Sequence, residues 1–247
     1  MVKIGLQLYS IREQMEQDFW GSLQKVKEAG YDAVEFAGFY DHSAAELKGR
    51  LADMGLEPYS THSRLDGDIK ALAEFTGALG ISYVIVPGAA SDTMEACQAI
   101  NAQLKAAVPV FADKGITIGY HNHWQEFVKH DGRYALDIIL DGVEGICEVD
   151  TAWVVQGGVD PVAYIKGLGK KAGPIHAKDI NADYATRSPH DVNVCIGEGV
   201  VDFPAIFAAM HAAGTLDRGI VVEQEAFTVP VFEALAKNVR ELRALTK

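Results

Sequence analysis

The chain has 247 residues, 49% of them hydrophobic, which is long enough to bury a substantial core and is expected to form one domain over residues 1–247. Its 22 Lys and Arg against 34 Asp and Glu give a net charge of −12, which argues against nucleic acid and membrane partners. Three cysteines without a CxxC pair, and no signal-peptide pattern, argue against a disulfide framework or a thiolate zinc site and favour a cytoplasmic location.

Short apolar runs rich in Val and Ile alternate with longer stretches of helical periodicity, which predicts parallel strands joined by helices. In chain order the predicted strands cover residues 3–8, 33–37, 57–62, 83–87, 117–123, 145–150, 174–178 and 219–223. Glycines suited to helix ends follow the helical stretches, at Gly30, Gly55, Gly80, Gly115 and Gly214. Eight such units predict a (β/α)8 barrel. The polar stretch 181–199 is long for a loop, and we expect it to be functional.

A metal site is predicted where these strands end. Side chains two residues apart share one face of a strand, and one face of each barrel strand points at the axis. In this phase, polar residues gather near the C-terminal strand ends, where barrel enzymes place their catalytic groups. The four candidate ligands are His121, Asp150, His176 and Glu223. Because buried charges need partners, a divalent cation is expected among them; the mixed nitrogen and oxygen set favours Mn²⁺, with Co²⁺, Fe²⁺, Zn²⁺ or Mg²⁺ as alternatives.

Other polar residues at matching positions are predicted to line a substrate pocket. These are Gln7, Glu35, His62, His123, Glu148 and Lys178. Two of them have a structural alternative: Glu148 could orient a ligand from behind or pair with Lys178, and Lys178 could be the ion-pair partner of a buried carboxylate. Trp124 could be simple loop packing, and His190 is expected to be an ordinary surface residue.

Seven segments resemble one known family when taken in order. They are GLQLYSIRE, GYDAVEFAGF, GYHNHWQEF, CEVDTAW, PIHAKD, GEGVVDF and VVEQE. They are similar to the xylose isomerase-like barrel superfamily, in its sugar phosphate isomerase/epimerase branch, which also includes endonucleases acting at abasic DNA sites. The resemblance covers nearly the whole chain.

The resemblance implies a metal held by Glu, Asp, His and Glu from four strands. The last three match Asp150, His176 and Glu223, whereas the first Glu falls at His121. In such relatives the two Glu residues also act as an acid/base pair, so His121 is a departure. An imidazole can bind a metal or move protons near neutral pH, so the site remains chemically competent.

The implied activity is that of a metal-dependent sugar or keto-sugar isomerase or epimerase. The metal polarises a carbonyl while a carboxylate removes the neighbouring proton, giving a metal-stabilised enediolate. Glu223 is the predicted base, with His121 and Lys178 as further catalytic candidates. Because His121 breaks the paired-Glu pattern, the alternative is a metal-dependent dehydratase or lyase, of the inosose dehydratase type or acting on 3-keto-glycosides.

Two other classes are weaker readings of the same residues. The acidic charge argues against an endonuclease, and a non-catalytic sugar-binding barrel has no distinguishing pattern in the sequence. The expected partner is a small-molecule sugar or keto-sugar, more consistent with an unphosphorylated one because no phosphate-cradling loop is evident. The resemblance also implies a homo-oligomer, since relatives commonly form dimers or tetramers.

Overall fold

Eight parallel strands close into a barrel in the computed structural model, which describes residues 2–247. The strands are β1 (Ile4–Gln7), β2 (Ala33–Phe36), β3 (Glu57–His62), β4 (Tyr83–Val86), β5 (Thr117–His121), β8 (Ile146–Asp150), β9 (Ala172–Ala177) and β12 (Ile220–Val222). Each pairs with the next along the chain, and β12 pairs with β1 to close the ring. The predicted (β/α)8 barrel is confirmed. Met1, the first residue of the predicted domain, lies outside the described residues.

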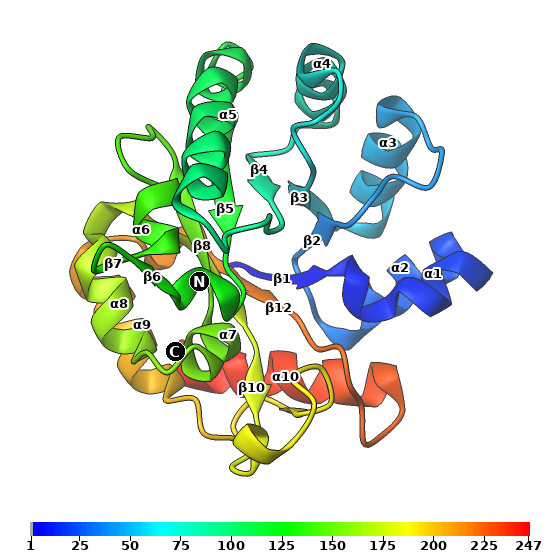
Figure 1. Cartoon of the computed structure of the whole chain (residues 1–247). Helices are drawn as coiled ribbons and strands as arrows, with labels where there is room; N and C mark the ends of the chain where they lie inside the picture. The colour runs from blue at the N-terminus through cyan, green and yellow to red at the C-terminus, as the bar shows by residue number, and fades with distance from the viewer. Residues whose placement is uncertain (1) are drawn as a thin grey trace.

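Helices surround the strands on the outside of the barrel, as Figure 1 shows. They are α1 (Arg12–Gln17), α2 (Phe19–Ala29), α3 (Ala44–Met54), α4 (Ile69–Leu79), α5 (Met94–Ala112), α6 (Ala135–Ile139), α7 (Thr151–Gln156), α8 (Pro161–Leu168), α9 (Phe203–Ala213) and α10 (Val231–Leu245). Short paired strands, β6 (Lys129–His130) with β7 (Arg133–Tyr134) and β10 (Asp179–Ile180) with β11 (Asn193–Val194), lie in the loops. None of the helices within residues 2–247 has the length and apolar character needed to span a membrane.

Local sequence explains where the helices begin and end. Asp18 accepts a hydrogen bond from the Gly21 N–H in the first turn of α2, which satisfies a donor that has no partner inside the helix. The predicted glycine ends of four helices are confirmed as left-handed C-caps, at Gly30, Gly55, Gly80 and Gly214. Gly115 differs, because α5 already ends at Ala112 and the left-handed Gly115 lies in the turn that follows.

The two faces of the strands carry different side chains. Ile118, Val149 and Ile175 face outward and belong to the hydrophobic core beneath the helices. On the inner face, Ala33 and Val221 precede Glu35 and Glu223 by two residues and pack with other apolar groups at the bottom of the barrel. The inner face therefore changes along the strands from an apolar floor to a polar C-terminal rim.

The strand ends differ slightly from the predicted ranges. β5 ends at His121 rather than at residue 123, because the chain then turns into a short 3-10 helix, Gln125–Phe127. β9 begins two residues early and ends at Ala177, and β12 ends at Val222. Lys178 and Glu223 consequently follow their strands directly, and His123 lies two residues beyond the end of β5, instead of lying within the strands.

The long loop after β9 is fixed at its base by Asp179, which is 1% exposed. Its Oδ2 accepts hydrogen bonds from Gly197 N and Gly199 N, both at 3.0 Å, and its Oδ1 accepts from Val201 N at 3.1 Å. A Cβ on Gly199 would collide with this carboxylate, so only glycine fits there. One buried side chain thus holds both ends of the loop at the barrel rim.

We expect Asp179→Ala to lower the free energy of unfolding by at least about 2 kcal/mol, because several buried N–H groups would lose their acceptor. Urea denaturation followed by circular dichroism measures this change. Asp183→Ala is the control from the same loop, since the Asp183 side chain is 64% exposed, and we expect it to change stability by less than about 0.5 kcal/mol. Equal losses in both variants would show that Asp179 does not anchor the loop.

Candidate metal centre

Four side chains from four strand ends converge at the C-terminal rim of the barrel. They are His121, Asp150, His176 and Glu223, each offering one donor atom, and these atoms lie within 4.8 Å of one another. His121 Nε2 lies 3.6 Å from Asp150 Oδ2, and His176 Nδ1 lies 3.2 Å from Glu223 Oε2. All four residues are buried. The structure therefore brings together the four residues predicted as ligands.

Two of these residues have donor atoms without a partner within the described chain. Both ring nitrogens of His121 and the Oδ2 of Asp150 are buried and make no hydrogen bond among residues 2–247. The other oxygen of Asp150 is occupied, because it caps α7 by accepting from Trp153 N at 2.9 Å. Buried polar atoms normally have partners. This geometry fits a cation bound between Asp150 and His121.

The protonation state of His121 also suits a metal ligand. Burial, reinforced by the neighbouring His176 and His62, holds the pKa of His121 well below its ordinary value. The ring is thus neutral near pH 7 and carries a free lone pair. Burial raises the pKa of Asp150 to about 6 despite the attraction of Lys178, so this carboxylate is mostly ionised at neutral pH.

A supporting layer, formed by Gln7, Glu35, Ser60, His62 and Glu148, lies directly against the other side of His176. His176 Nε2 lies 2.6 Å from Glu35 Oε1 and 3.1 Å from Glu148 Oε2. Gln7 and Ser60 each donate to Glu35 at 2.6 Å. His176 therefore joins the supporting layer, through Nε2, to the metal-ligand group, through Nδ1.

Three residues predicted to bind substrate belong to this supporting layer instead of the pocket wall. Gln7, Glu35 and Glu148 are fully buried, and the described pockets do not include them. Glu148 accepts from His62 Nε2 at 2.8 Å and contacts His176, not Lys178. Of the two alternatives for Glu148, its contacts match the orientation of a histidine ring.

The imidazoles of His62 and His176 balance the buried carboxylates. Burial alone lowers the pKa of His176, but Glu148 and Glu35 beside the ring raise it well above its ordinary value. Burial likewise opposes protonation of His62, and Glu35 and Glu148 again give a net rise in its pKa. For Glu223, burial raises the pKa, but Lys178 and His176 outweigh it and hold this carboxylate ionised.

Lys178 is a buried ion-pair partner of carboxylates. Its Nζ donates to Glu223 Oε2 at 3.0 Å and to Glu225, and it lies 3.7 Å from Asp150 Oδ2. It also sits 4.3 Å from the centre of the Trp153 ring, in a cation–π arrangement. The structural alternative for Lys178 matches these contacts, and Lys178 does not line either of the two cavities above the site.

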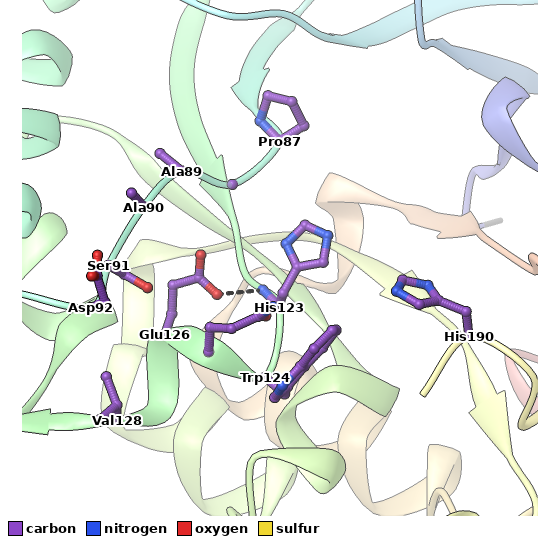
Figure 2. Close-up of a pocket in the computed structure, with 12 residues that line it drawn as sticks. Pro87, Ala89, Ala90, Ser91, Asp92, His123, Trp124, Glu126, Val128 and His190 are labelled. Carbon is purple, nitrogen blue, oxygen red and sulfur yellow. Dashed lines mark hydrogen bonds between the residues drawn. The ribbon is translucent and has the colours of Figure 1, made fainter. Parts of the chain in front are cut away.

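Two adjoining cavities lie beside the candidate ligands, and two of these ligands, His121 and Glu223, line the smaller cavity. The smaller, of about 330 Å³, is lined by Tyr9, Ala37, His62, Pro87, His121, His123, His190, Glu223 and Glu225. The larger, of about 690 Å³ and drawn in Figure 2, is lined by residues 87–92 and 123–126 with Val128 and His190. Pro87, His123 and His190 belong to both. His62 and His123 are thus the predicted substrate-binding residues that reach a cavity.

His190 is the residue that the sequence analysis missed. It was expected to be an ordinary surface histidine, yet its half-exposed ring lines both cavities and lies 3.2 Å from Glu225 Oε2. The long loop anchored by Asp179 carries His190 to the rim. The unusual length of stretch 181–199 is the signal that pointed to this region without identifying the residue.

Comparisons with known proteins agree with the barrel fold. Residues 23–246 match the family model described as xylose isomerase-like TIM barrel. The chain therefore belongs to this family.

Individual relatives are distant. The chain is 23% identical over 230 residues to an inosose dehydratase of Geobacillus kaustophilus (strain HTA426), covering 76% of this chain and 74% of that protein. It superimposes on a sugar phosphate isomerase/epimerase from Parabacteroides distasonis ATCC 8503 with a TM-score of 0.84 at 24% identity, covering 100% and 96% of the two chains. The IolI protein with a bound zinc atom gives a TM-score of 0.78 at 16% identity, covering 98% and 97%.

We expect Lys178→Met to destabilise the metal-free protein by about 3–5 kcal/mol, because it leaves the buried Glu223 and the partly exposed Glu225 without their cation. A bound divalent cation would offset part of this loss. Thermal unfolding with EDTA and with Mn²⁺ measures both effects, and the Mn²⁺-induced rise in Tm should be larger in the variant than in the wild type. Lys237→Met, at an exposed ion pair, is the control. An unchanged metal-free Tm would contradict the ion-pair role.

Proposed function

We propose that this protein is a metal-dependent enzyme that removes a proton from the carbon beside the keto group of a sugar or keto-sugar, and returns it to give isomerisation or epimerisation. The observation that carries the proposal is the convergence of buried donors without partners on one side of a sugar-sized cavity. The relatives described as a sugar phosphate isomerase/epimerase and an inosose dehydratase support a polyhydroxylated substrate.

His121, Asp150, His176 and Glu223 would hold the cation. His62, His121, Glu148 and His176 form a second possible group, but Glu148 does not reach the cavity, whereas Glu223 does. The mixed nitrogen and oxygen donors support Mn²⁺, with Co²⁺, Fe²⁺ or Zn²⁺ next and Mg²⁺ least suited. When bound, the cation supplies a positive charge that polarises the substrate carbonyl and makes the neighbouring C–H more acidic.

Glu223 is the proposed base. It is ionised, it lines the smaller cavity, and within residues 2–247 its hydrogen bonds to His176 and Lys178 both use Oε2. Its Oε1 is therefore the oxygen available to accept the substrate proton. Lys178, fixed in turn by Glu225, keeps the carboxylate in one orientation while the proton moves.

Imidazole groups provide further polar contacts in the smaller cavity. His62, His121 and His123 line it together with Glu223. Their N–H groups can donate hydrogen bonds to substrate hydroxyls, and His62, whose pKa is raised by the neighbouring carboxylates, can return a proton to a neighbouring carbon. Glu148 holds the His62 ring from behind, so His62 is proposed to bind substrate through a ring whose orientation is fixed.

Elimination is the second candidate function, and the side chains that line the smaller cavity support it. The carboxylates that line the smaller cavity are Glu223 and Glu225, and Glu225 is already engaged by Lys178 and His190. Position 121, which the family resemblance fills with a second Glu, here carries an imidazole. One carboxylate base with imidazole donors suits proton removal followed by loss of a β-substituent, as in a dehydratase or lyase.

We expect Asp150→Asn and His121→Ala each to weaken Mn²⁺ binding at least tenfold, because each removes one of the four donors. His121→Glu should retain binding, since a carboxylate replaces the imidazole. Isothermal titration of the EDTA-treated protein measures the affinities, and His42→Ala, at a partly buried histidine that is not a candidate ligand, is the control. Wild-type affinity in both Asp150→Asn and His121→Ala would remove the proposed metal centre.

We expect Glu223→Gln to slow solvent exchange of the substrate C–H proton by about 10²- to 10⁴-fold, the usual contribution of a general base. The metal-loaded protein is incubated with a panel of ketoses and 3-keto-glycosides in D₂O and followed by NMR, with metal content measured in parallel. Glu233→Gln, an exposed residue of α10, is the control.

The products distinguish the candidate functions. Deuterium incorporation without elimination supports the isomerase or epimerase, and an unsaturated product supports the lyase. Binding without exchange or elimination anywhere in the panel would instead identify a sugar-binding barrel. Full turnover by metal-loaded Glu223→Gln would show that another group is the base.

A further inference from the structure

The larger cavity is not needed by the proposed proton transfer. That chemistry requires only the smaller cavity of about 330 Å³ next to Glu223, whereas the neighbouring space measures about 690 Å³. Figure 2 shows this space between the loop after β4, with Pro87 and Ala90, and the loop after β5, with His123 and Trp124. The larger cavity therefore leaves room for a second group beside the proposed reaction site.

Buried hydrogen bonds fix the walls of the larger cavity. The Tyr120 hydroxyl donates to Glu126 Oε1 and accepts from Ala89 N, both at 2.9 Å, so it ties the two loops together. The second oxygen of Glu126 accepts from His123 N at 2.8 Å, the contact drawn in Figure 2. Tyr120 and Glu126 are both at most 2% exposed. The cavity is therefore a preformed feature of the barrel rim.

Gly88 lets the imidazole of His123 approach the loop after β4. Its φ of 95° lies in the left-handed region, and a Cβ at this position would come within 2.8 Å of His123 Nδ1. Glycine is thus required both by the backbone and by the ring. Because His123 lines both cavities, this close approach shapes the passage between them.

The lining of the larger cavity suits an uncharged, partly apolar ring. Pro87, Ala89, Ala90, Trp124 and Val128 supply its apolar surface. Its charged lining residues, within the described chain, are Asp92 and Glu126, and neither Lys nor Arg contributes to the wall. A phosphate or carboxylate would find no Lys or Arg in this wall and would lie near the acidic Asp92, in a protein that already carries a net charge of −12.

Trp124 supplies an aromatic wall that is held in place. Its ring packs against Trp153 with centroids 4.9 Å apart and lies 5.8 Å from the ring of His190. Trp153 is in turn 1% exposed and in contact with Lys178. An indole fixed on one side and open to a cavity on the other is suited to stack against a planar or sugar ring.

We propose that the larger cavity is a second substrate subsite, which takes an uncharged ring attached to the keto-sugar and stacked on Trp124. The shared wall of Pro87, His123 and His190 lets a single molecule occupy both cavities. The inference rests on the proposed function for the keto-sugar half, and it identifies the substrate as a keto-sugar carrying a second ring, either an aromatic group or another sugar.

The test compares substrates that differ only in the second ring. Deuterium exchange in D₂O is measured for 3-keto-glucose and for its phenyl β-glycoside, with the Mn²⁺-loaded enzyme. We expect the phenyl compound to have a KM at least tenfold lower, because its ring buries apolar surface against Trp124. A 4-carboxyphenyl analogue should lose this advantage, and a disaccharide analogue shows whether a sugar ring can replace the phenyl group.

Two variants locate the effect. Trp124→Ala removes the stacking surface, and Ala90→Phe fills the cavity from the opposite loop; each should raise KM for the phenyl compound about tenfold and change that for 3-keto-glucose less than twofold. Trp20→Ala, at a tryptophan of α2 that packs against Phe19 and Arg50, is the matched control and should change neither. Equal KM values for the two substrates, or a folded Ala90→Phe enzyme that keeps the phenyl preference, would overturn the subsite.

A binding measurement separates failure of the subsite from failure of the proposed function. Saturation-transfer NMR with the non-keto probes glucose and phenyl β-D-glucoside does not depend on any proton transfer. Absence of exchange with both keto substrates contradicts the proposed function, and binding of phenyl β-D-glucoside that Ala90→Phe abolishes would then still support the subsite. Absence of phenyl β-D-glucoside binding together with absence of exchange would overturn it.

Discussion

The buried negative charge at the barrel rim is the constraint on which the rest of the structure depends. Glu35, Glu148, Asp150 and Glu223 are at most 6% exposed and lie around the single ring of His176. Isolated ionised carboxylates in such a setting are strongly unfavourable, so the surrounding residues have to compensate them. Lys178 and the histidines with raised pKa values provide this compensation. The positions of these cations determine which carboxylates remain free for chemistry.

His176 links the supporting layer, where buried charges are balanced, to the proposed metal centre. Its Nε2 faces Glu35 and Glu148, which keep the ring oriented, and its Nδ1 faces Asp150 and Glu223. A cation that binds at Nδ1 displaces the proton from that nitrogen. The positive charge of the cation therefore replaces the positive charge of the protonated ring and is not simply added to it. The supporting layer can then remain charged in the same way with and without the cation. Residues one layer below the pocket thereby set the geometry of the ligands above them.

The alternation of side chains along the strands predicts which residues converge on the barrel axis, but not how deep in the barrel each of them lies. Glu148 and Asp150 share one face of β8, and the parallel strand ends oblige both to point at the axis. How deep each of the two lies depends on the stagger of neighbouring strands, which the alternation of side chains does not specify. For this reason Gln7, Glu35 and Glu148, predicted to line the substrate pocket, are fully buried and line neither cavity. His190 comes from an irregular loop fixed by a carboxylate 11 residues earlier in the chain, and no local pattern identifies such a contact.

The imidazole at position 121 changes the charge of the proposed centre. The ligand pattern implied by the family resemblance has three carboxylates, whereas this chain has Asp150 and Glu223 with two imidazoles. With His121 neutral, two carboxylates balance a divalent cation completely, and a third would leave the group negative. Negative charge that develops on a substrate oxygen would consequently be repelled by two carboxylates at this centre, instead of the three in the family pattern. The same replacement removes the second carboxylate that a symmetric proton exchange across the substrate would use. In the proposed function, His121 would therefore favour the formation of charge on the substrate and would weaken the means of returning the proton to the opposite face.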